Sequence, residues 1–515
     1  MSQDDRRVRL ATASLDRLPE SVARPRYPRD RLEPGILHLG VGAFHRCHQA
    51  EWTDDALEAR FGAWGIVGVN LRPPDLHGIL GEQDGWFCRI TRGGGVDHAR
   101  LIGSILETLS VLPTGGDADR ATLHRALRWA ADPRIRVVTL TVTEKGYCHV
   151  PATGALDVSH PDILHDRAHP EAPVSVPGFV LHAMALRLRA GVALPAIVSC
   201  DNVPENGATL RRCVVSLARL SDPGLAAAIE RDGCFLDTVV DRIVPATREE
   251  DVESFATATG VEDRGLVVGE SFRMWVIEKP ADVVLPAWDA AGALFVVDAA
   301  PYESLKMRVL NGIQSNLCQL GALSGIDFMA DVMALPEFRR FAERVMHREV
   351  LPCLPDVPGI DPRGYVAESI ERLANPALKH RTSQIATDGS RKIKQRLLEP
   401  IRDALAMGIP CDGLLLGVAG WMQYATGEDA RGGSFAVSDP IASRAREVAQ
   451  RARGDAAALV HGLLALDTVF GRDLPERGEV VEALIAFMAR LLARPAREVV
   501  REFLTFHVPS AMGRP

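Results

Sequence analysis

The sequence predicts an α/β fold in two parts, a parallel β-sheet covered by helices and then a mostly α-helical domain. Three observations predict this fold. The chain has 515 residues, more than one typical domain holds. Its first half alternates strand-like apolar runs with helix-like segments, as parallel sheets do. After about residue 300 only helical periodicity remains. We therefore expect domain 1–296 to precede domain 297–515.

Four strands are predicted in the first half. Each is a short run rich in apolar or β-branched residues. The segment 234–245 follows a helical stretch and is ambiguous. The strands are expected at 35–40, 63–69, 134–142 and 194–200, and helices at 49–60 and near 177–190.

The second half contains segments of helical periodicity that Pro and Gly clusters separate. No convincing strand pattern occurs among them, so this domain is predicted to be all-α. The helical segments lie near 301–323, 335–350, 363–374, 390–408, 412–425, 440–452, 454–468, 477–493 and 495–507.

Composition argues against several classes of partner. The net charge is −8 and no basic stripe with interleaved aromatic residues occurs, so no nucleic-acid partner is expected. No apolar run approaches the roughly 20 residues of a membrane span, and the charged start lacks the apolar core of a signal peptide. Nine dispersed cysteines without a Cys-x-x-Cys pair are typical of free thiols in a reducing cytosol. No second pair of ligands completes a metal site with His45 and His48. We expect a cytoplasmic protein without a metal or a membrane partner.

A glycine-rich turn follows the first predicted strand. Its place between a strand and a helix is the context of a dinucleotide-binding turn. The first glycine allows the tight turn, and the second lets a pyrophosphate approach backbone N–H groups. The third glycine of that motif is missing, and His45 stands there. The same residues also fit a plain strand-to-helix turn. The turn consists of Gly40, Val41, Gly42, Ala43 and Phe44.

The residues after the second strand leave the coenzyme open. An acid is expected about twenty residues after the turn, where it would bind the ribose 2′-OH of NAD. Here the strand ends in Asn70, and Arg72 follows. Arg72 could meet the 2′-phosphate of NADP, so we expect NAD and do not exclude NADP. Polar clusters with Glu144 and Asn202 follow two later strands, where ligands of open α/β sheets bind. Asn202 also fits an ordinary turn.

A lysine and two carboxamides recur at helical spacing in the second half. On an α-helix, Asn311 would lie about 140° and Gln314 about 80° around the axis from Lys306. A lysine of lowered pKa can act as a general base, and a carboxamide can donate to an oxyanion. This combination suits removal of a proton from an alcohol. The spacing alone also fits an ordinary polar helix face.

These segments, taken in order, resemble the polyol-specific long-chain dehydrogenases, the group of mannitol 2-dehydrogenase and fructuronate (mannonate) reductase. The resemblance extends from about Leu32 to about Arg490. It implies an N-terminal Rossmann-type doubly wound domain, a mostly helical C-terminal domain and an NAD(P)-dependent reaction without zinc. The matching segments are 39–46, 143–147, 199–202, 240–245, 306–314 and 384–392.

The resemblance also implies roles for individual residues. Lys306 would be the general base, and Asn311 and Asn202 would hold the developing alkoxide. Glu303 matches a glutamate that helps to exchange the proton with solvent. The pKa of the base would have to be lowered towards the working pH by partial burial and by the cationic nicotinamide.

Three further residues match substrate-contacting positions: Lys392, Arg381 and Asp241. A substrate with a carboxylate would need a cationic partner, for which Arg381, Arg391 and Lys392 are candidates. These three residues also fit a solvated basic cluster. The family leans towards monomers, so a monomer or a small homo-oligomer is expected.

One residue departs from the family pattern. The usual pattern is Lys-x4-Asn-x2-His, and this chain has Gln314 at the histidine position. Glutamine can donate a hydrogen bond but cannot gain charge near neutral pH. Loss of an oxyanion donor typically costs about 10²–10³ in rate, and replacement by another donor should cost less. Gln314 therefore puts the rate or the substrate in doubt, but not the fold.

The sequence thus predicts an oxidoreductase that interconverts a polyol or sugar acid of the mannitol or mannonate type and its 2-keto sugar. The segment 384–392 is closer to the fructuronate reductases than to mannitol dehydrogenase. The alternative is a catalytically weakened protein that senses the dinucleotide or a sugar acid. Retention of Lys306, Asn311 and Asn202 argues against that alternative.

Overall fold

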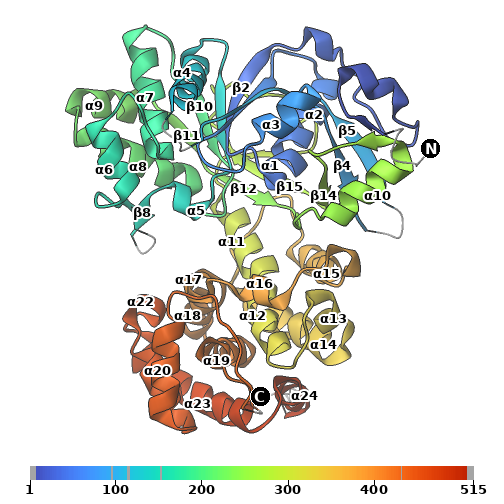
Figure 1. Cartoon of the computed structure of the whole chain (residues 1–515). Coiled ribbons are helices and arrows are strands. Elements are labelled where there is room, and N and C mark those ends of the chain that lie inside the picture. The colour runs from blue at the N-terminus through green and yellow to red at the C-terminus, as the bar shows by residue number, and fades with distance from the viewer. Residues whose placement is uncertain (1–6, 94–96, 113–115, 151–152, 431, 507–515) are drawn as a thin grey trace. The chain divides into compact units, whose positions relative to one another are not determined.

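Figure 1 shows a computed structural model that describes residues 7–506, apart from 94–96, 113–115, 151–152 and 431. The chain divides into two compact units, Met1–Ala300 and Pro301–Pro515. The sequence-based boundary lay slightly earlier, between residues 296 and 297. None of the described helices combines the length and the apolar character that a membrane span needs.

A six-stranded parallel sheet forms the centre of the first unit. Counted along the chain within the sheet, the strands read 3-2-1-4-5-6 from the β6 edge, which is the Rossmann order. The strand order therefore reverses between β2 and β7, at the switch point where such sheets bind ligands. The strands are β2 (Pro34–Leu39), β3 (Gly65–Asn70), β6 (Ile105–Ser110), β7 (Val137–Leu140), β10 (Ala196–Ser199) and β11 (Cys234–Leu236).

Helices cover both faces of this sheet (Figure 1). Successive strand side chains point to opposite faces, so Ile36 belongs to one hydrophobic core and Leu37 to the other. This arrangement confirms the predicted parallel sheet with helical crossovers. The core of Leu37 contains α4 (Asp117–Ala131), α7 (Val176–Arg189) and α8 (Asn206–Arg219), and that of Ile36 contains α1 (Ala43–Cys47) and α2 (Gln49–Ala59).

Side-chain caps determine where several helices begin. Ser175 accepts a hydrogen bond from the N–H of Gly178 (2.9 Å), so α7 begins at the next residue, Val176. Asp222 accepts one from the N–H of Leu225 (2.9 Å) at the start of α9 (Pro223–Asp232). Proline occupies the first turn of both helices, where its missing N–H leaves no bond unmade.

Four small sheets and several short helices complete the first unit. The sequence analysis missed most of these strands, because each has only two to five residues. The ambiguous segment 234–245 contains two strands that belong to different sheets. These elements are β1 (Val8–Arg9), β4 (Phe87–Thr91), β5 (His98–Ile102), β8 (His149–Val150), β9 (Ala155–Leu156), β12 (Thr238–Asp241), β13 (Val261–Glu262), β14 (Val267–Gly269), β15 (Met274–Glu278), β16 (Leu294–Val296), α3 (His77–Leu80), α5 (Thr143–Gly146), α6 (Pro161–Ala168) and α10 (Glu249–Thr259), with 3₁₀ turns at Thr12–Arg17, Arg29–Arg31 and Gly81–Gln83.

The second unit is helical, as predicted; where the structure describes it, extended pairing is limited to two isolated bridges. Every segment predicted to be helical contains helix. The helices are α11 (Ala300–Arg308), α12 (Leu310–Ala322), α13 (Met329–Ala334), α14 (Pro336–Val345), α15 (Pro362–Leu373), α16 (Thr382–Ala386), α17 (Gly389–Ile393), α18 (Glu399–Met407), α19 (Asp412–Thr426), α20 (Ala442–Ala452), α21 (Ala456–Leu464), α22 (Asp467–Phe470), α23 (Gly478–Ala493) and α24 (Ala496–Phe506), with π-helical turns η5 (Met346–Val350) and η8 (Lys394–Leu398) and 3₁₀ turns at Leu351–Cys353, Pro376–Leu378 and Leu474–Glu476.

The buried helix α19 packs closely against α12. A Cβ on Gly417 would lie 2.2 Å from Oδ1 of Asn316, and one on Gly420 would lie 2.7 Å from Leu320. A larger residue at either position of α19 would therefore displace a side chain of α12. The packing fixes α12, the helix that carries Asn311 and Gln314.

Candidate active site

The glycine-rich turn joins β2 to α1. Gly40 has φ = +90°, and a Cβ there would lie 2.3 Å from the carbonyl O of Thr141, so only glycine fits. A Cβ on Gly42 would meet only the carbonyl O of Gly40, at 3.9 Å. The space beside Gly42 is therefore open, as a bound pyrophosphate would require.

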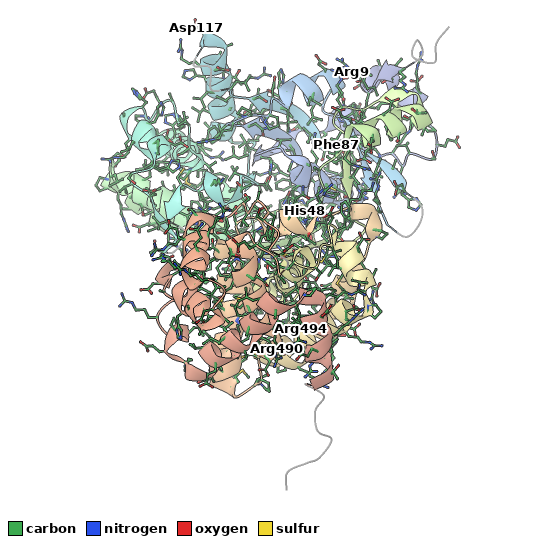
Figure 2. The ribbon with its side chains drawn as sticks, turned by 60° about the horizontal axis from the view of Figure 1, so that its bottom comes forward. Arg9, His48, Phe87, Asp117, Arg490 and Arg494 are labelled. Carbon is green, nitrogen blue, oxygen red and sulfur yellow. The ribbon has the colours of Figure 1, made fainter. Side chains whose placement is uncertain are left out.

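His45 occupies the place of the missing third glycine, which normally allows a helix to pack closely on the sheet. Its ring stacks on that of His38 with centroids 3.5 Å apart. Burial lowers the pKa of both rings, that of His38 to about 3. The two neutral rings thus fill the contact between β2 and α1. His48, labelled in Figure 2, lies between α1 and α2 in the chain and is also buried, and its Nε2 lies 3.2 Å from the carbonyl O of Met274.

A cavity of about 310 Å³ lies at the carboxyl ends of β2, β3 and β7. This is the switch point of the sheet, so the cavity lies where a Rossmann sheet binds its dinucleotide. The structure brings five predicted coenzyme residues to its wall: Gly40, Val41, Gly42, Asn70 and Arg72. Ala43 and Phe44 follow on α1.

Asn70 stands at the end of β3 and is almost completely buried. Its Oδ1 accepts a hydrogen bond from the N–H of Val41 (2.7 Å), and its Nδ2 donates to the carbonyl O of Pro74 (3.3 Å). Asn70 therefore holds the glycine turn against the end of β3, which was not foreseen from the sequence.

Arg72 forms an ion pair with Asp162 of α6 across the cavity wall. Sequence analysis missed Asp162, because it lies 90 residues further along the chain. An acid thus lies beside the residues after β3, and it comes from a distant helix. The sequence shows the acid of α6, but only the fold shows that this acid lies beside Arg72.

The turn after β7 is held by the carboxylate of Asp201. It accepts hydrogen bonds from the N–H groups of Val142 (3.1 Å) and Thr143 (2.7 Å) and from Oη of Tyr147 (3.1 Å). Burial raises the pKa of Asp201 to about 6, although these bonds favour the ionised form. Glu144 lies on this turn, in α5, and the predicted Asn202 follows Asp201 at an exposed position.

Asp241 ends β12 and is buried. The next residue, Arg242, donates to the carbonyl O of Cys47 and to the carboxylate of Glu51. Burial would raise the pKa of Glu51, but Arg242, Arg89 and Arg273 lower it to about 2. The signature segment 240–245 therefore ties β12 to the two helices after the glycine turn.

In the second unit, Lys306 lies on α11 and Asn311 on α12. The prediction of one continuous helix is wrong at Val309, whose φ and ψ of −90° and −79° separate the two helices. The angles expected for a regular helix therefore do not apply across this break. Backbone bonding still crosses it, because the N–H of Val309 donates to Leu305 O (2.9 Å).

The three polar residues of this segment are buried. Lys306, Asn311 and Gln314 are 4%, 7% and 9% exposed. Nδ2 of Asn311 lies 3.0 Å from the sulfur of Met307. Glu303 is on α11, one helical turn before Lys306. The structure thus concentrates an amine, two amides and a carboxylate on two consecutive helices.

The predicted cations of the second unit differ in their surroundings. Arg381 is exposed, lies 3.7 Å from Asp327 and stacks over Phe328. Lys392 on α17 is partly buried, and its Nζ donates to the carbonyl O of Ile385 (3.2 Å). Sequence analysis missed Arg396 on η8, whose Nη1 donates to Oγ of Ser315 (3.1 Å). The sequence signal for Arg396 is its spacing of four residues from Lys392.

One group of potential metal ligands occurs in the described part of the chain. Ligand atoms of Cys148, His160 and Asp162 lie within 4.8 Å of one another. Asp162 is already paired with Arg72, and burial raises the pKa of Cys148 to about 12, which keeps the thiol protonated. These surroundings do not favour a metal. The absence of zinc from the reaction stays a prediction.

Comparison with known proteins assigns both halves of the chain. Residues 34–290 match the family model described as the mannitol dehydrogenase Rossmann domain. Residues 298–492 match the model of the mannitol dehydrogenase C-terminal domain.

Individual proteins agree with these matches. The chain is 41% identical to D-mannonate oxidoreductase of Escherichia coli (strain K12), over 93% of this chain and 97% of the relative. It is 36% identical to mannitol 2-dehydrogenase of Cereibacter sphaeroides, over 95% of this chain and 100% of the relative. Among solved structures, Pseudomonas fluorescens mannitol 2-dehydrogenase in ternary complex with NAD and D-mannitol matches with a TM-score of 0.85 and 33% identity, over 97% of this chain and 100% of that one.

Proposed function

The chain belongs to the mannitol dehydrogenase family, and we propose that it interconverts a polyol or sugar acid and its 2-keto sugar with NAD(H), using Lys306 as general base and no zinc. Its coarser class, an oxidoreductase acting on polyols or sugar acids, follows from the named relatives. The observation that carries the detailed proposal is the buried set of Lys306, Asn311 and Gln314.

The first unit supplies the coenzyme pocket. The open space at Gly42 accommodates a pyrophosphate, and the cavity at the switch point accommodates the nucleotide. When bound, NAD supplies the hydride acceptor for the oxidation. The solved relative with NAD and D-mannitol supports this coenzyme.

The proposed proton chemistry centres on Lys306. In oxidation, Nζ of Lys306 as the neutral amine takes the proton from the substrate hydroxyl. The amides of Asn311 and Asn202 donate to the developing alkoxide. Glu303 exchanges the proton with solvent. In reduction, Lys306 as the ammonium returns the proton to the carbonyl oxygen.

Gln314 replaces a histidine that could carry charge. Its amide still donates one hydrogen bond, so the site keeps a donor at that position. The 41% identity with D-mannonate oxidoreductase favours a sugar acid as substrate.

A spectrophotometric screen tests the reaction. Reduction of fructuronate, tagaturonate, fructose and pentuloses is followed by loss of NADH or NADPH absorbance, before and after treatment with a chelator. We expect turnover with at least one 2-keto substrate and no loss on chelation. Tight dinucleotide binding without turnover of any substrate would favour a sensor.

The lysine is tested by Lys306→Ala. We expect kcat to fall by about 10²–10⁴, because a general base is removed, while the Kd for NAD stays within about twofold. The control is Lys394→Ala, which removes an exposed lysine of the same unit. Turnover of the Lys306 variant within a few-fold of wild type would exclude the role.

A further inference from the structure

Two cations of the second unit share one region without a carboxylate partner. Arg396 lies four residues after Lys392, one helical turn further along. Arg396 donates to the hydroxyl of Ser315 and Lys392 to a carbonyl oxygen, and within the described residues neither is in ion-pair contact with an acid. Each cation therefore keeps N–H groups for a further acceptor.

One histidine and two acids lie close enough to Lys392 to interact with its charge. Nδ1 of the partly buried His380 ring has no hydrogen-bond partner, and burial, followed by the charge of Lys392, lowers the pKa of this ring. Asp388 and Asp439 partly offset the charge of Lys392. Asp439, however, already accepts bonds from the N–H groups of Ser390 (2.7 Å) and Ile441 (3.0 Å).

Burial makes two neighbouring cations unfavourable. It lowers the pKa of Arg396 to about 10, and burial together with Arg396 lowers the pKa of Lys392. A buried charge is stable when a partner of opposite sign meets it. The site therefore has the properties of an anion site, and the planar guanidinium matches a carboxylate in a bidentate manner.

The cations lie beside the helix that carries the proposed reaction amides. The guanidinium of Arg396 bonds to Ser315, the residue directly after Gln314. The carbonyl O of Arg396 lies 3.4 Å from the position of a Cβ on Gly312, the residue directly after Asn311. The π-helical turn η8 thus packs on the first turns of α12, and such turns are frequent at functional sites.

We propose that Arg396, with Lys392, binds the carboxylate of the substrate, so that the enzyme selects a sugar acid over a neutral sugar of the same length. The inference rests on the proposed function and names its substrate class. Arg381 is exposed and already has Asp327 within 3.7 Å, so it is not needed for this role.

Paired substrates test the selection. For wild type and Arg396→Gln, kcat/KM is measured with fructuronate and with fructose. We expect the variant to lose about 10- to 100-fold with the acid, since a charge-assisted bond is removed, and less than about threefold with fructose. Arg396→Lys should restore part of the loss. Lys394→Gln, which removes an exposed cation of the same turn, should change neither value.

A milder variant covers the case in which Arg396→Gln does not fold. Ser315→Ala removes the bond that orients the guanidinium. We expect KM for fructuronate to rise several-fold, with kcat and the KM for fructose nearly unchanged. Equal losses with both sugars in these variants, or a wild type that prefers fructose, would overturn the inference.

Binding measurements distinguish a failure of this inference from a failure of the proposed function. If the wild type turns over no sugar, the proposed function fails. Calorimetric titration with D-mannonate and D-mannitol in the presence of NAD then still tests whether the carboxylate site exists. Tighter binding of the acid by wild type than by Arg396→Gln supports the carboxylate site. Equal binding by the two proteins refutes it.

Discussion

At the scale of single residues, the two glycines of the coenzyme turn have different reasons to be glycine. Gly40 is required by the backbone, because its φ is +90° and Thr141 O leaves no room for a Cβ. Gly42 is not required by the protein, since a Cβ there would meet only one atom, at 3.9 Å. The second glycine is therefore explained by a ligand.

This difference predicts opposite effects of the same substitution. Gly42→Ala should weaken NAD binding by about tenfold or more and shift Tm by less than about 2 °C. Gly40→Ala should destabilise the fold by about 1–3 kcal/mol, because alanine is strained at positive φ. Titration with NAD and thermal unfolding measure the two effects. Unchanged NAD binding in Gly42→Ala would argue against a pyrophosphate at this turn.

The sequence indicates those site residues that belong to one contiguous local pattern. The glycines are recognisable because β2, the turn and α1 are contiguous. Asp162 and Arg396 were missed because their partners, Arg72 and Ser315, are 90 and 81 residues away in the chain. Asn70 was expected to meet the coenzyme; it lies on the cavity wall, and its additional bond to Val41 was not foreseen.

At the scale of elements, α6 modifies the coenzyme site at the end of β3. Asp162 pairs with Arg72, which removes most of the attraction of that guanidinium for a 2′-phosphate. We therefore expect this short helix to favour NAD, even though the strand itself ends in an amide.

Asp162→Asn should shift the coenzyme preference towards NADPH. With Arg72 released, we expect the ratio of kcat/KM for NADPH to that for NADH to rise about tenfold. In Arg72→Ala, by contrast, the ratio should not rise. Measuring both coenzymes with one 2-keto substrate gives the ratio directly, and an unchanged ratio in Asp162→Asn would show that the ion pair does not select.

Glu349 holds the start of α19 from the π-helical turn η5. Its carboxylate accepts bonds from the N–H groups of Gly413 (3.0 Å) and Leu414 (2.9 Å). Burial nevertheless raises its pKa to about 7, well above the usual range of a glutamate. The folded state therefore holds this proton more tightly than the unfolded state does.

The raised pKa predicts a pH dependence of stability. The contribution of Glu349 is complete below the unfolded pKa and is lost as pH rises through about 7. The loss is on the order of 3 kcal/mol. In urea titrations at about pH 5 and about pH 8, Glu349→Gln should lose less stability on raising the pH than wild type. An equal pH dependence in the two proteins would assign the effect to other buried acids.

Element boundaries were harder to predict than element types. The periodicity of 301–323 correctly indicated helix but could not reveal the break at Val309, because every residue there is compatible with helix. The strand expected at 134–142 is shorter, Val137–Leu140. The small sheets were missed because their strands are too short to show alternation.

At the scale of the whole molecule, the chain combines a nucleotide-binding unit with a helical unit that carries the proposed base. Six of the seven tryptophans precede residue 301, and Trp421 is the exception. Intrinsic fluorescence therefore reports mainly on the first unit.

This distribution allows the coenzyme to be linked to stability. At about 100 times its Kd, NAD should stabilise the state that binds it by about 2.7 kcal/mol. Urea titration followed by fluorescence should show this gain in wild type. Gly42→Ala should show a much smaller gain at the same NAD concentration. A gain of equal size in both proteins would indicate that NAD binds elsewhere.

The bonds around the coenzyme turn also bear on the rate of association. Asn70 holds Val41, the hydroxyl of Thr141 donates to Gly40 O (2.8 Å), and Asp201 holds the N–H groups of 142 and 143. These segments are fixed by the protein itself, so an arriving dinucleotide does not have to order them. Association should then be a single step limited by encounter and orientation, and differences in affinity among variants of the turn should appear mainly in the dissociation rate.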